Sequence, residues 1–184
     1  MIVNVRGTSG SGKSHLVKQV MQCYLYSTPR HVEGRKQPLY YECQHPRKEN
    51  NLFVLGHYAT ACGGCDTISK DPFDTVFGLV EQLAQHGDVM FEGLLVSAEQ
   101  RRTKEKLQKD AVIIGLSTPL EECLASIGLR RAERGDERPL NPENTTKRYN
   151  SLERMYPRLK AEGLNVLRFS REEALAFVRE AFGV

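Results

Sequence analysis

Gly7-Thr8-Ser9-Gly10-Ser11-Gly12-Lys13-Ser14, at residues 7–14, is a complete G-x-x-x-x-G-K-[ST] phosphate loop. The apolar residues 2–5 directly precede it, and an apolar helical face follows at Leu16, Val17, Val20, Met21 and Tyr24. A buried strand that turns through glycines into a helix aims backbone N–H groups and the positive end of the helix at one point. The sequence therefore predicts a nucleoside triphosphate site, in which Lys13 reaches the β- and γ-phosphates and Ser14 joins the shell of Mg²⁺.

The size and composition of the chain limit its class. Its 184 residues suffice for one α/β domain and are too few for two ordinary ones, so we expect a single domain over residues 1–184. With 40 % hydrophobic and 27 % charged residues it is typical of a soluble globular protein. No apolar run approaches the ~20 residues that span a bilayer. No leader precedes the first strand, so we expect a cytoplasmic protein whose five cysteines are thiols.

The strand and helix patterns alternate along the chain. Strands are predicted at residues 2–5, 39–41, 52–55, 89–91, 111–116 and 165–169, the second and third joined as a hairpin. Helices are predicted to begin near Asp71 and Pro72 and over residues 97–109, 119–134, 143–162 and 171–182. This order predicts a three-layer α/β fold, with a mostly parallel sheet flanked by helices on both faces. Ligands are then expected at the carboxyl ends of the strands.

Two acidic residues follow predicted strands and are candidates for catalysis. Glu92 ends the strand at residues 89–91, where a carboxylate can hold Mg²⁺; the alternative is that it only caps the next turn. Asp66 comes after Gly63 and Gly64, two glycines that let the backbone approach a substrate closely. We expect Asp66 to accept the proton of an attacking hydroxyl.

The segment that leads to Asp66 carries further candidates. His57 and Tyr58 offer flat faces on which a base could stack. Cys62 and Cys65 have C-x-x-C spacing, and Cys43 and His45 could complete a zinc site with them. A single C-x-x-C pair is weak evidence for zinc, so the commoner interpretation is a shaped substrate loop with small packing cysteines.

The basic residues are unevenly placed on a chain of net charge +3. Residues 101–109 carry five bases against one acid, and residues 130–158 carry eight bases. Such surfaces suit a phosphate-rich partner, although solvated helix faces are an equally good alternative. Within the second stretch, residues 130–145 are predicted to form an arginine-rich lid over the transferred phosphate, with Arg130 and Arg134 on one helical face.

These motifs resemble those of the P-loop kinase superfamily over essentially the whole chain. The chain has no N-K-x-D guanine motif, and Glu92-Gly93-Leu94 stands where thymidylate kinases carry an Asp-Arg pair. The phosphate loop with Val5 and Arg6 before it, the segments at residues 56–58 and 62–66 and Phe91-Glu92-Gly93 most resemble bacteriophage kinases that phosphorylate 5-hydroxymethyluracil in DNA.

The resemblance implies a transferase that uses ATP and Mg²⁺ and acts on a base extruded from DNA. Arg102 and Lys106, on the predicted basic helix, are then expected to contact DNA phosphates. No protein partner is expected. Two alternatives remain open at the level of sequence: a kinase of a free nucleoside, nucleotide or small metabolite, and an ATP-dependent binding switch without a phosphoryl acceptor.

Overall fold

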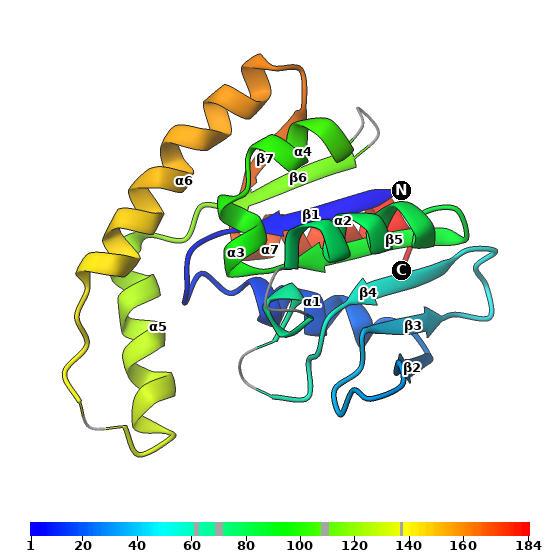
Figure 1. The fold of residues 1–184 in the computed structure, drawn as a ribbon, viewed down its shortest axis with the longest axis horizontal. Helices are drawn as coiled ribbons and strands as arrows, with labels where there is room; N and C mark the ends of the chain where they lie inside the picture. The colour runs from blue at the N-terminus through cyan, green and yellow to red at the C-terminus, as the bar shows by residue number, and fades with distance from the viewer. Residues whose placement is uncertain (61–62, 69–71, 108–110, 137) are drawn as a thin grey trace.

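The computed structural model describes residues 1–60, 63–68, 72–107, 111–136 and 138–184. All seven of its named strands belong to one sheet, in the order β2-β3-β4-β5-β1-β6-β7. β4, β5, β1, β6 and β7 run parallel, while β2 and β3 are antiparallel at one edge (Figure 1). The strands are β1 (Ile2–Arg6), β2 (Tyr26–Arg30), β3 (Tyr40–Gln44), β4 (Asn51–Leu55), β5 (Gly87–Glu92), β6 (Ala111–Leu116) and β7 (Asn165–Phe169).

Helices cover both faces of the sheet. On one face lie α1 (Lys13–Met21) and α7 (Arg171–Phe182). The other face is covered by α2 (Pro72–Leu83), α3 (Leu94–Ala98), α4 (Arg101–Lys106) and α6 (Glu143–Ala161). The helix α5 (Leu120–Ala132) lies beside α6 at the end of the sheet where the phosphate loop is found, and a short helical turn, η1 (Cys65–Thr67), follows β4 (Figure 1).

The core forms two hydrophobic clusters, one on each face of the sheet, because side chains alternate along a strand. In β4, Leu52 and Val54 pack toward α1 and α7, whereas Phe53 and Leu55 pack toward α2. Most strand residues are apolar on both faces, as in a covered parallel sheet, and the buried polar residues Asn4 and Arg6 of β1 are the exceptions in that strand. The predicted three-layer, mostly parallel α/β fold is confirmed.

The predicted strands and the hairpin of β3 and β4 are present. β2 was not predicted, because its five residues are all exposed and include Pro29, which is tolerated at a sheet edge. The continuous basic helix expected over residues 97–109 is instead two short helices, α3 and α4, and residues 108–110 lie outside the described residues. The predicted N-cap of α2, Asp71, also lies outside them.

Arg6, the residue before the phosphate loop, joins the α3–α4 connection to β1. Its guanidinium is fully buried and donates to Oδ1 of Asn4 at 2.5 Å, to the carbonyl oxygen of Glu99 at 3.1 Å and to the hydroxyl of Thr103. Burial lowers the pKa of Arg6 to about 10. These bonds hold the segment after β5 against the strand that carries the phosphate loop.

Searched for membrane-spanning segments, the described part of the chain yields no helix with the length and apolar character to cross a bilayer.

Candidate active site

The carboxyl ends of β1, β4 and β5 meet at one cavity of about 380 Å³. The phosphate loop forms one wall, and Arg130 of α5 lies in another. The lining residues are Ser9, Gly10, Gly12, Lys13, Ser14, His15, Gly63, Asp66, Glu92, Leu94, Ser126, Arg130 and Arg171. The fold therefore gathers residues far apart in sequence at the edge where a parallel sheet binds ligands.

The phosphate loop has the backbone that its glycines predict. Gly10 and Gly12 have φ angles of 80° and 95°, in the left-handed region that glycine adopts without strain. A Cβ atom at Gly10 would lie 2.1 Å from the carbonyl oxygen of Cys123 in α5. Among the described residues, none caps the N-terminus of α1 through its side chain. The N–H groups of the first helical turn, which lack helical partners, are thus available to an anion.

Lys13 is buried and bonded to its own loop. Its Nζ atom donates to the carbonyl oxygens of Gly7, at 2.9 Å, and Thr8, at 3.0 Å. Burial lowers the pKa of Lys13, while the nearby carboxylates of Glu92 and Asp66 oppose that shift. The ammonium group of Lys13 is thus held beside the phosphate loop at the cavity, where it is well placed to bind phosphate oxygens.

Glu92 lies directly opposite the phosphate loop. The hydroxyl of Ser14 donates to its Oε1 atom at 2.7 Å. Burial raises the pKa of Glu92, and the charge of Lys13 and the bond from Ser14 act against that rise. A hydroxyl and a carboxylate side by side are the hard oxygen ligands that Mg²⁺ prefers, so this pair fits a magnesium ion.

Asp66 reaches the same cavity from η1. The backbone N–H groups of Leu94 and Leu95 donate to its two carboxylate oxygens, at 2.6 Å and 3.0 Å. Asp66 therefore caps the start of α3, the role that the alternative interpretation gave to Glu92. Its carboxylate also lines the cavity, so capping and proton acceptance are both compatible with its position.

The two glycines before Asp66 allow the close approach that the sequence predicts. Gly64 has a φ of 82°, and a Cβ atom there would lie 2.5 Å from Oε1 of Glu92. A Cβ atom at Gly63 would lie 2.3 Å from the carbonyl oxygen of His57. Any larger residue at either position would displace the backbone that carries Asp66 and faces Glu92.

His57 and Tyr58, which were expected to offer open faces to a base, are both largely buried in this structure, so stacking on them stays a prediction. Tyr58 is 5 % exposed and packs in the core, with its ring 6.2 Å from that of Tyr41. His57 is buried as well, and its backbone pairs with Gly64. Neither side chain lines the cavity at the phosphate loop, because Tyr58 packs into the core cluster on the α1 face and His57 is buried as well.

The described cysteines do not assemble a zinc site. Cys43 lies in the cluster on the α1 face, where Ser27 is its polar contact at 3.4 Å. Cys65 lies in the cluster on the opposite face. Cys62 lies outside the described residues, and within those residues no group of three or more ligating side chains could hold a metal. Cys43 and Cys65 are small packing residues, as the commoner interpretation has it.

The two lid arginines are in different environments. Arg130 lines the cavity and is near enough to Lys13 to affect its pKa. α5 ends at Ala132, so Arg134 does not continue its helical face and is exposed. Beyond the helix, Asp136 accepts bonds from Arg131 at 3.0 Å and from Arg138 at 2.8 Å and 2.9 Å, which ties the start of the lid together.

Arg171 lines the cavity although no motif in the sequence indicates it. It begins α7, lines the cavity and lies against Gly12, where a Cβ atom would come 2.6 Å from its Cδ. Its guanidinium also bonds Glu122 at 3.2 Å. The available signal was its place directly after the last strand, at the carboxyl end where ligands bind.

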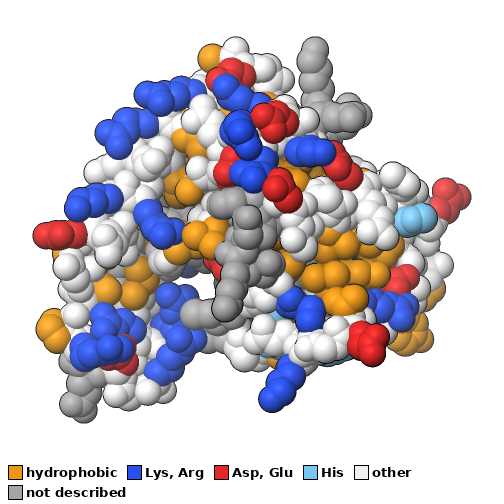
Figure 2. All heavy atoms as spheres, viewed as in Figure 1, with side chains coloured by type: hydrophobic (Ala, Val, Ile, Leu, Met, Phe, Trp, Pro, Cys, Tyr) orange, Lys and Arg blue, Asp and Glu red, His pale blue; other side chains and the backbone are white. Residues whose placement is uncertain are grey.

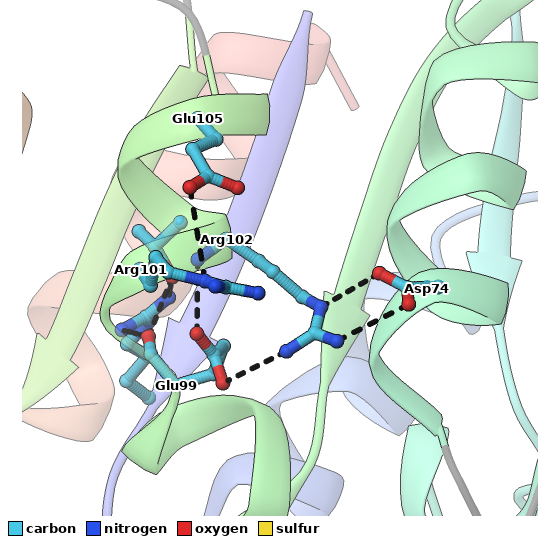
Figure 3. Close-up of polar contacts among 7 residues, drawn as sticks. Asp74, Glu99, Arg101, Arg102 and Glu105 are labelled. Carbon is cyan, nitrogen blue, oxygen red and sulfur yellow. Dashed lines mark hydrogen bonds and ion pairs between the residues drawn. The ribbon is translucent and has the colours of Figure 1, made fainter.

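Arg102 and Lys106, expected to contact DNA, are paired with acids. Arg102 bonds both carboxylate oxygens of Asp74, at 2.6 Å and 3.1 Å, and lies 3.8 Å from Glu99 (Figure 3). Lys106 lies 3.1 Å from Glu81 of α2. Contact of Arg102 and Lys106 with DNA stays a prediction. Their ion pairs with acids of the protein neutralise part of the positive charge that would attract a DNA phosphate.

The strand, phosphate loop and helix at the N-terminus, the five parallel strands and the paired carboxylates define a P-loop kinase fold. A solved structure of deoxyadenosine kinase from M. mycoides, with products dCMP and dCDP, shares this fold with a TM-score of 0.53 and 14 % identity. The alignment covers 100 % of this chain and 99 % of that one.

Sequence comparison gives the family. The chain is 39 % identical over 183 residues to the 5-hmdU DNA kinase of Pseudomonas phage PaMx11, covering 97 % of this chain and 95 % of that protein. It is 28 % identical over 167 residues to the 5-hmdU DNA kinase of Delftia phage PhiW-14, of which it spans 59 %. No family model matches the chain. The chain belongs to the family of 5-hmdU DNA kinases.

Proposed function

We propose that this protein transfers the γ-phosphate of ATP to the hydroxymethyl group of 5-hydroxymethyluracil in DNA. The proposal rests on its membership of the 5-hmdU DNA kinase family. The observation that carries it is a single cavity in which the phosphate loop faces two carboxylates, Glu92 and Asp66. Such a kinase would act on phage DNA in the cytoplasm of the bacterial host.

On this proposal, the phosphate loop holds the nucleotide. Backbone N–H groups at the start of α1 bind phosphate oxygens, and Lys13 leaves the carbonyl oxygens of Gly7 and Thr8 to bind the γ-phosphate. Ser14 and Glu92 would hold Mg²⁺, which neutralises charge on the phosphates when it is bound. Arg130 adds a second positive charge on the lid side of the cavity.

Asp66 is the proposed general base. The hydroxymethyl oxygen bonds to the γ-phosphorus, the bond from that phosphorus to the β,γ-bridging oxygen breaks, and the hydroxyl proton passes to Asp66. The N–H bonds from Leu94 and Leu95 hold the carboxylate in place for this transfer. ADP leaves with the bridging oxygen.

The test is phosphate transfer from labelled ATP to DNA that contains 5-hydroxymethyluracil, with free 5-hydroxymethyldeoxyuridine and unmodified DNA in parallel. We expect label on the modified DNA only. Lys13→Ala should lower the rate by at least ~10²-fold, because it removes a charge that stabilises the transferring phosphate. Label on the free nucleoside and none on DNA would overturn the proposal in favour of a nucleoside kinase. Equal turnover by a folded Lys13→Ala variant would overturn the assignment of the phosphate loop.

A further inference from the structure

One side of α6 carries basic residues that have no acidic partner. Lys147, Arg154 and Arg158 follow one another at intervals of seven and four residues, so they share a helical face, and Arg148 lies beside it. All four are arranged along a helix that is exposed on this side. Within the described ranges, the structure gives none of these four side chains an ion pair or a hydrogen bond.

The contrast with α4 is direct. There, Arg101 lies 3.7 Å from Glu105, Arg102 is bonded to Asp74, Lys104 pairs with Glu162, and Lys106 pairs with Glu81. Figure 2 shows the same difference: red and blue side chains are mixed over α4, whereas blue side chains gather over α6 with few red ones among them. Of these two helices, as far as the structure describes them, α6 is the one that carries basic side chains without acidic partners.

This basic face leads to the candidate active site through a row of hollows. A cavity of about 50 Å³ is lined by Leu94, Ala98, Arg148, Ser151 and Leu152. It shares Leu94 with the cavity at the phosphate loop. The next hollow, of about 360 Å³, is lined by Ala98, Gln100, Ser151, Arg154, Met155 and Arg158, and it shares Ala98 and Ser151 with the small one. Neighbouring hollows that share lining residues thus form a track between α3 and α6, from beside the cavity at the phosphate loop to Arg158.

We infer that this track, defined by Arg148, Ser151, Arg154 and Arg158, binds the sugar–phosphate backbone of the DNA strand that carries the acceptor base. The inference rests on the proposed function and adds the DNA interface to it. Arginine binds phosphate oxygens through two parallel N–H bonds, and the hydroxyl of Ser151 is a further phosphate donor.

The dimensions of the track fit a strand of nucleic acid. Arg148 and Arg158 are ten residues apart on one helix, which corresponds to roughly 15 Å along its axis. This length is enough for more than one phosphate of a DNA strand to lie along the helix. A base extruded at the near end of that stretch would enter the cavity that holds Asp66.

The test compares two double variants that each lose two positive charges. Arg154→Gln with Arg158→Gln alters the track and keeps most of each side-chain stem. Arg47→Gln with Lys160→Gln is the control: Arg47 lies on the β3–β4 loop, Lys160 lies on another side of α6, and both are exposed. The measurement is binding of a duplex with one 5-hydroxymethyluracil, by fluorescence anisotropy over a salt series, with thermal unfolding of each variant as a check of folding.

We expect the track variant to bind more weakly, with a salt slope smaller by about two units, because each lost phosphate contact removes ~0.9. The control should keep the wild-type slope. Equal slopes for the track variant and the wild type, or the same decrease in both variants, would overturn the inference. Transfer of phosphate to this DNA by the wild type is measured separately. If the wild type transfers none, the proposed function fails, while the salt slopes still decide whether the track binds DNA.

Discussion

The hydroxyl of Ser14 donates a hydrogen bond of 2.7 Å to Oε1 of Glu92, a residue 78 positions further along the chain. The bond joins the start of α1 to the end of β5 and is possible because β5 pairs directly with β1. Val5 and Glu92 are partners in the register of β1 and β5. This pairing fixes the position of the Glu92 carboxylate beside the phosphate loop, which follows β1 directly. Glu92 and Ser14 thus form a hydrogen-bonded pair, and Lys13 is near enough for its charge to lower the pKa of Glu92.

This arrangement makes Gly64 sensitive to substitution. In Gly64→Ala, the new methyl group would lie 2.5 Å from Oε1 of Glu92 on a backbone with φ of 82°. We expect a loss of unfolding free energy on the order of 2–5 kcal/mol, combining backbone strain and overpacking. The folded fraction should also have impaired phosphate transfer. Denaturant titration measures the first effect.

Gly34→Ala is the matched control for that experiment. Gly34 has a φ of 78° and no atom within 4 Å of the position of its Cβ, so the substitution places a side chain at positive φ without a clash. We expect it to cost about 1–2 kcal/mol. Equal losses of unfolding free energy in the two variants would show that the contact between the new methyl group and Glu92 adds nothing to the destabilisation.

Asp66 has two proposed tasks that substitution can separate. Asparagine and serine both accept N–H bonds at the start of a helix, and neither accepts a proton in this reaction. If Asp66 is the general base, Asp66→Asn and Asp66→Ser should both lower kcat by ~10²–10⁴-fold, with an unchanged KM for ATP. Asp66→Ala should in addition lose about 0.5–2 kcal/mol of stability with its cap.

Two outcomes would contradict this assignment. Wild-type turnover in Asp66→Asn and Asp66→Ser would make Asp66 only the cap of α3. The roles would be exchanged if Glu92→Gln lowered kcat without changing the ATP and Mg²⁺ concentrations needed for activity, while Asp66→Asn left kcat unchanged. Glu92 would then be the general base and Asp66 the residue that binds Mg²⁺.

Glu92 predicts a pH dependence of stability. Burial raises its pKa above the ordinary value of 4.5, so the folded state holds the proton more tightly than the unfolded state. Between 4.5 and the raised pKa the folded state binds more protons, and the free energy of unfolding therefore falls as the pH rises. Below pH 4.5 the folded and the unfolded state both hold the proton, so the ionisation of Glu92 no longer reduces the free energy of unfolding.

Glu92→Gln removes this titration. We expect the stability of the wild type relative to Glu92→Gln to be highest at low pH and to decrease as the pH rises through the window. Urea titrations across pH 4–8, without nucleotide or Mg²⁺, measure the difference. A difference that is independent of pH, or that grows with pH, would contradict a raised pKa.

The lid arginines should differ in their effect on catalysis. Arg130 lines the cavity, whereas Arg134 is exposed beyond the end of α5. Arg130→Ala is expected to lower kcat by ~10²–10³-fold through the loss of a charge near the transferring phosphate. Arg134→Ala should have a much smaller effect. Steady-state kinetics with saturating ATP and DNA test this, and an equal loss in both variants would mean that Arg134 also reaches the phosphate.

The sequence by itself determined the elements whose cause is local. The phosphate loop follows from glycine spacing, because only glycine adopts the φ angles of Gly10 and Gly12 without strain. The parallel sheet follows from the alternation of apolar strands with amphipathic helices. Glu92 was found because it ends a strand, and the carboxyl ends of parallel strands converge on the ligand.

Only the tertiary structure decided which side chains are open and which charges are paired. Tyr58 follows β4 as a stacking residue would, but the packing of α1 and β3 around it encloses its ring. Three bases of α4 pair with acids from α2 and from the end of α6. The partners are far apart in the sequence, so no local sequence pattern reveals these ion pairs. Burial and ion pairing depend on which elements pack together, and that is a property of the whole fold rather than of any one segment.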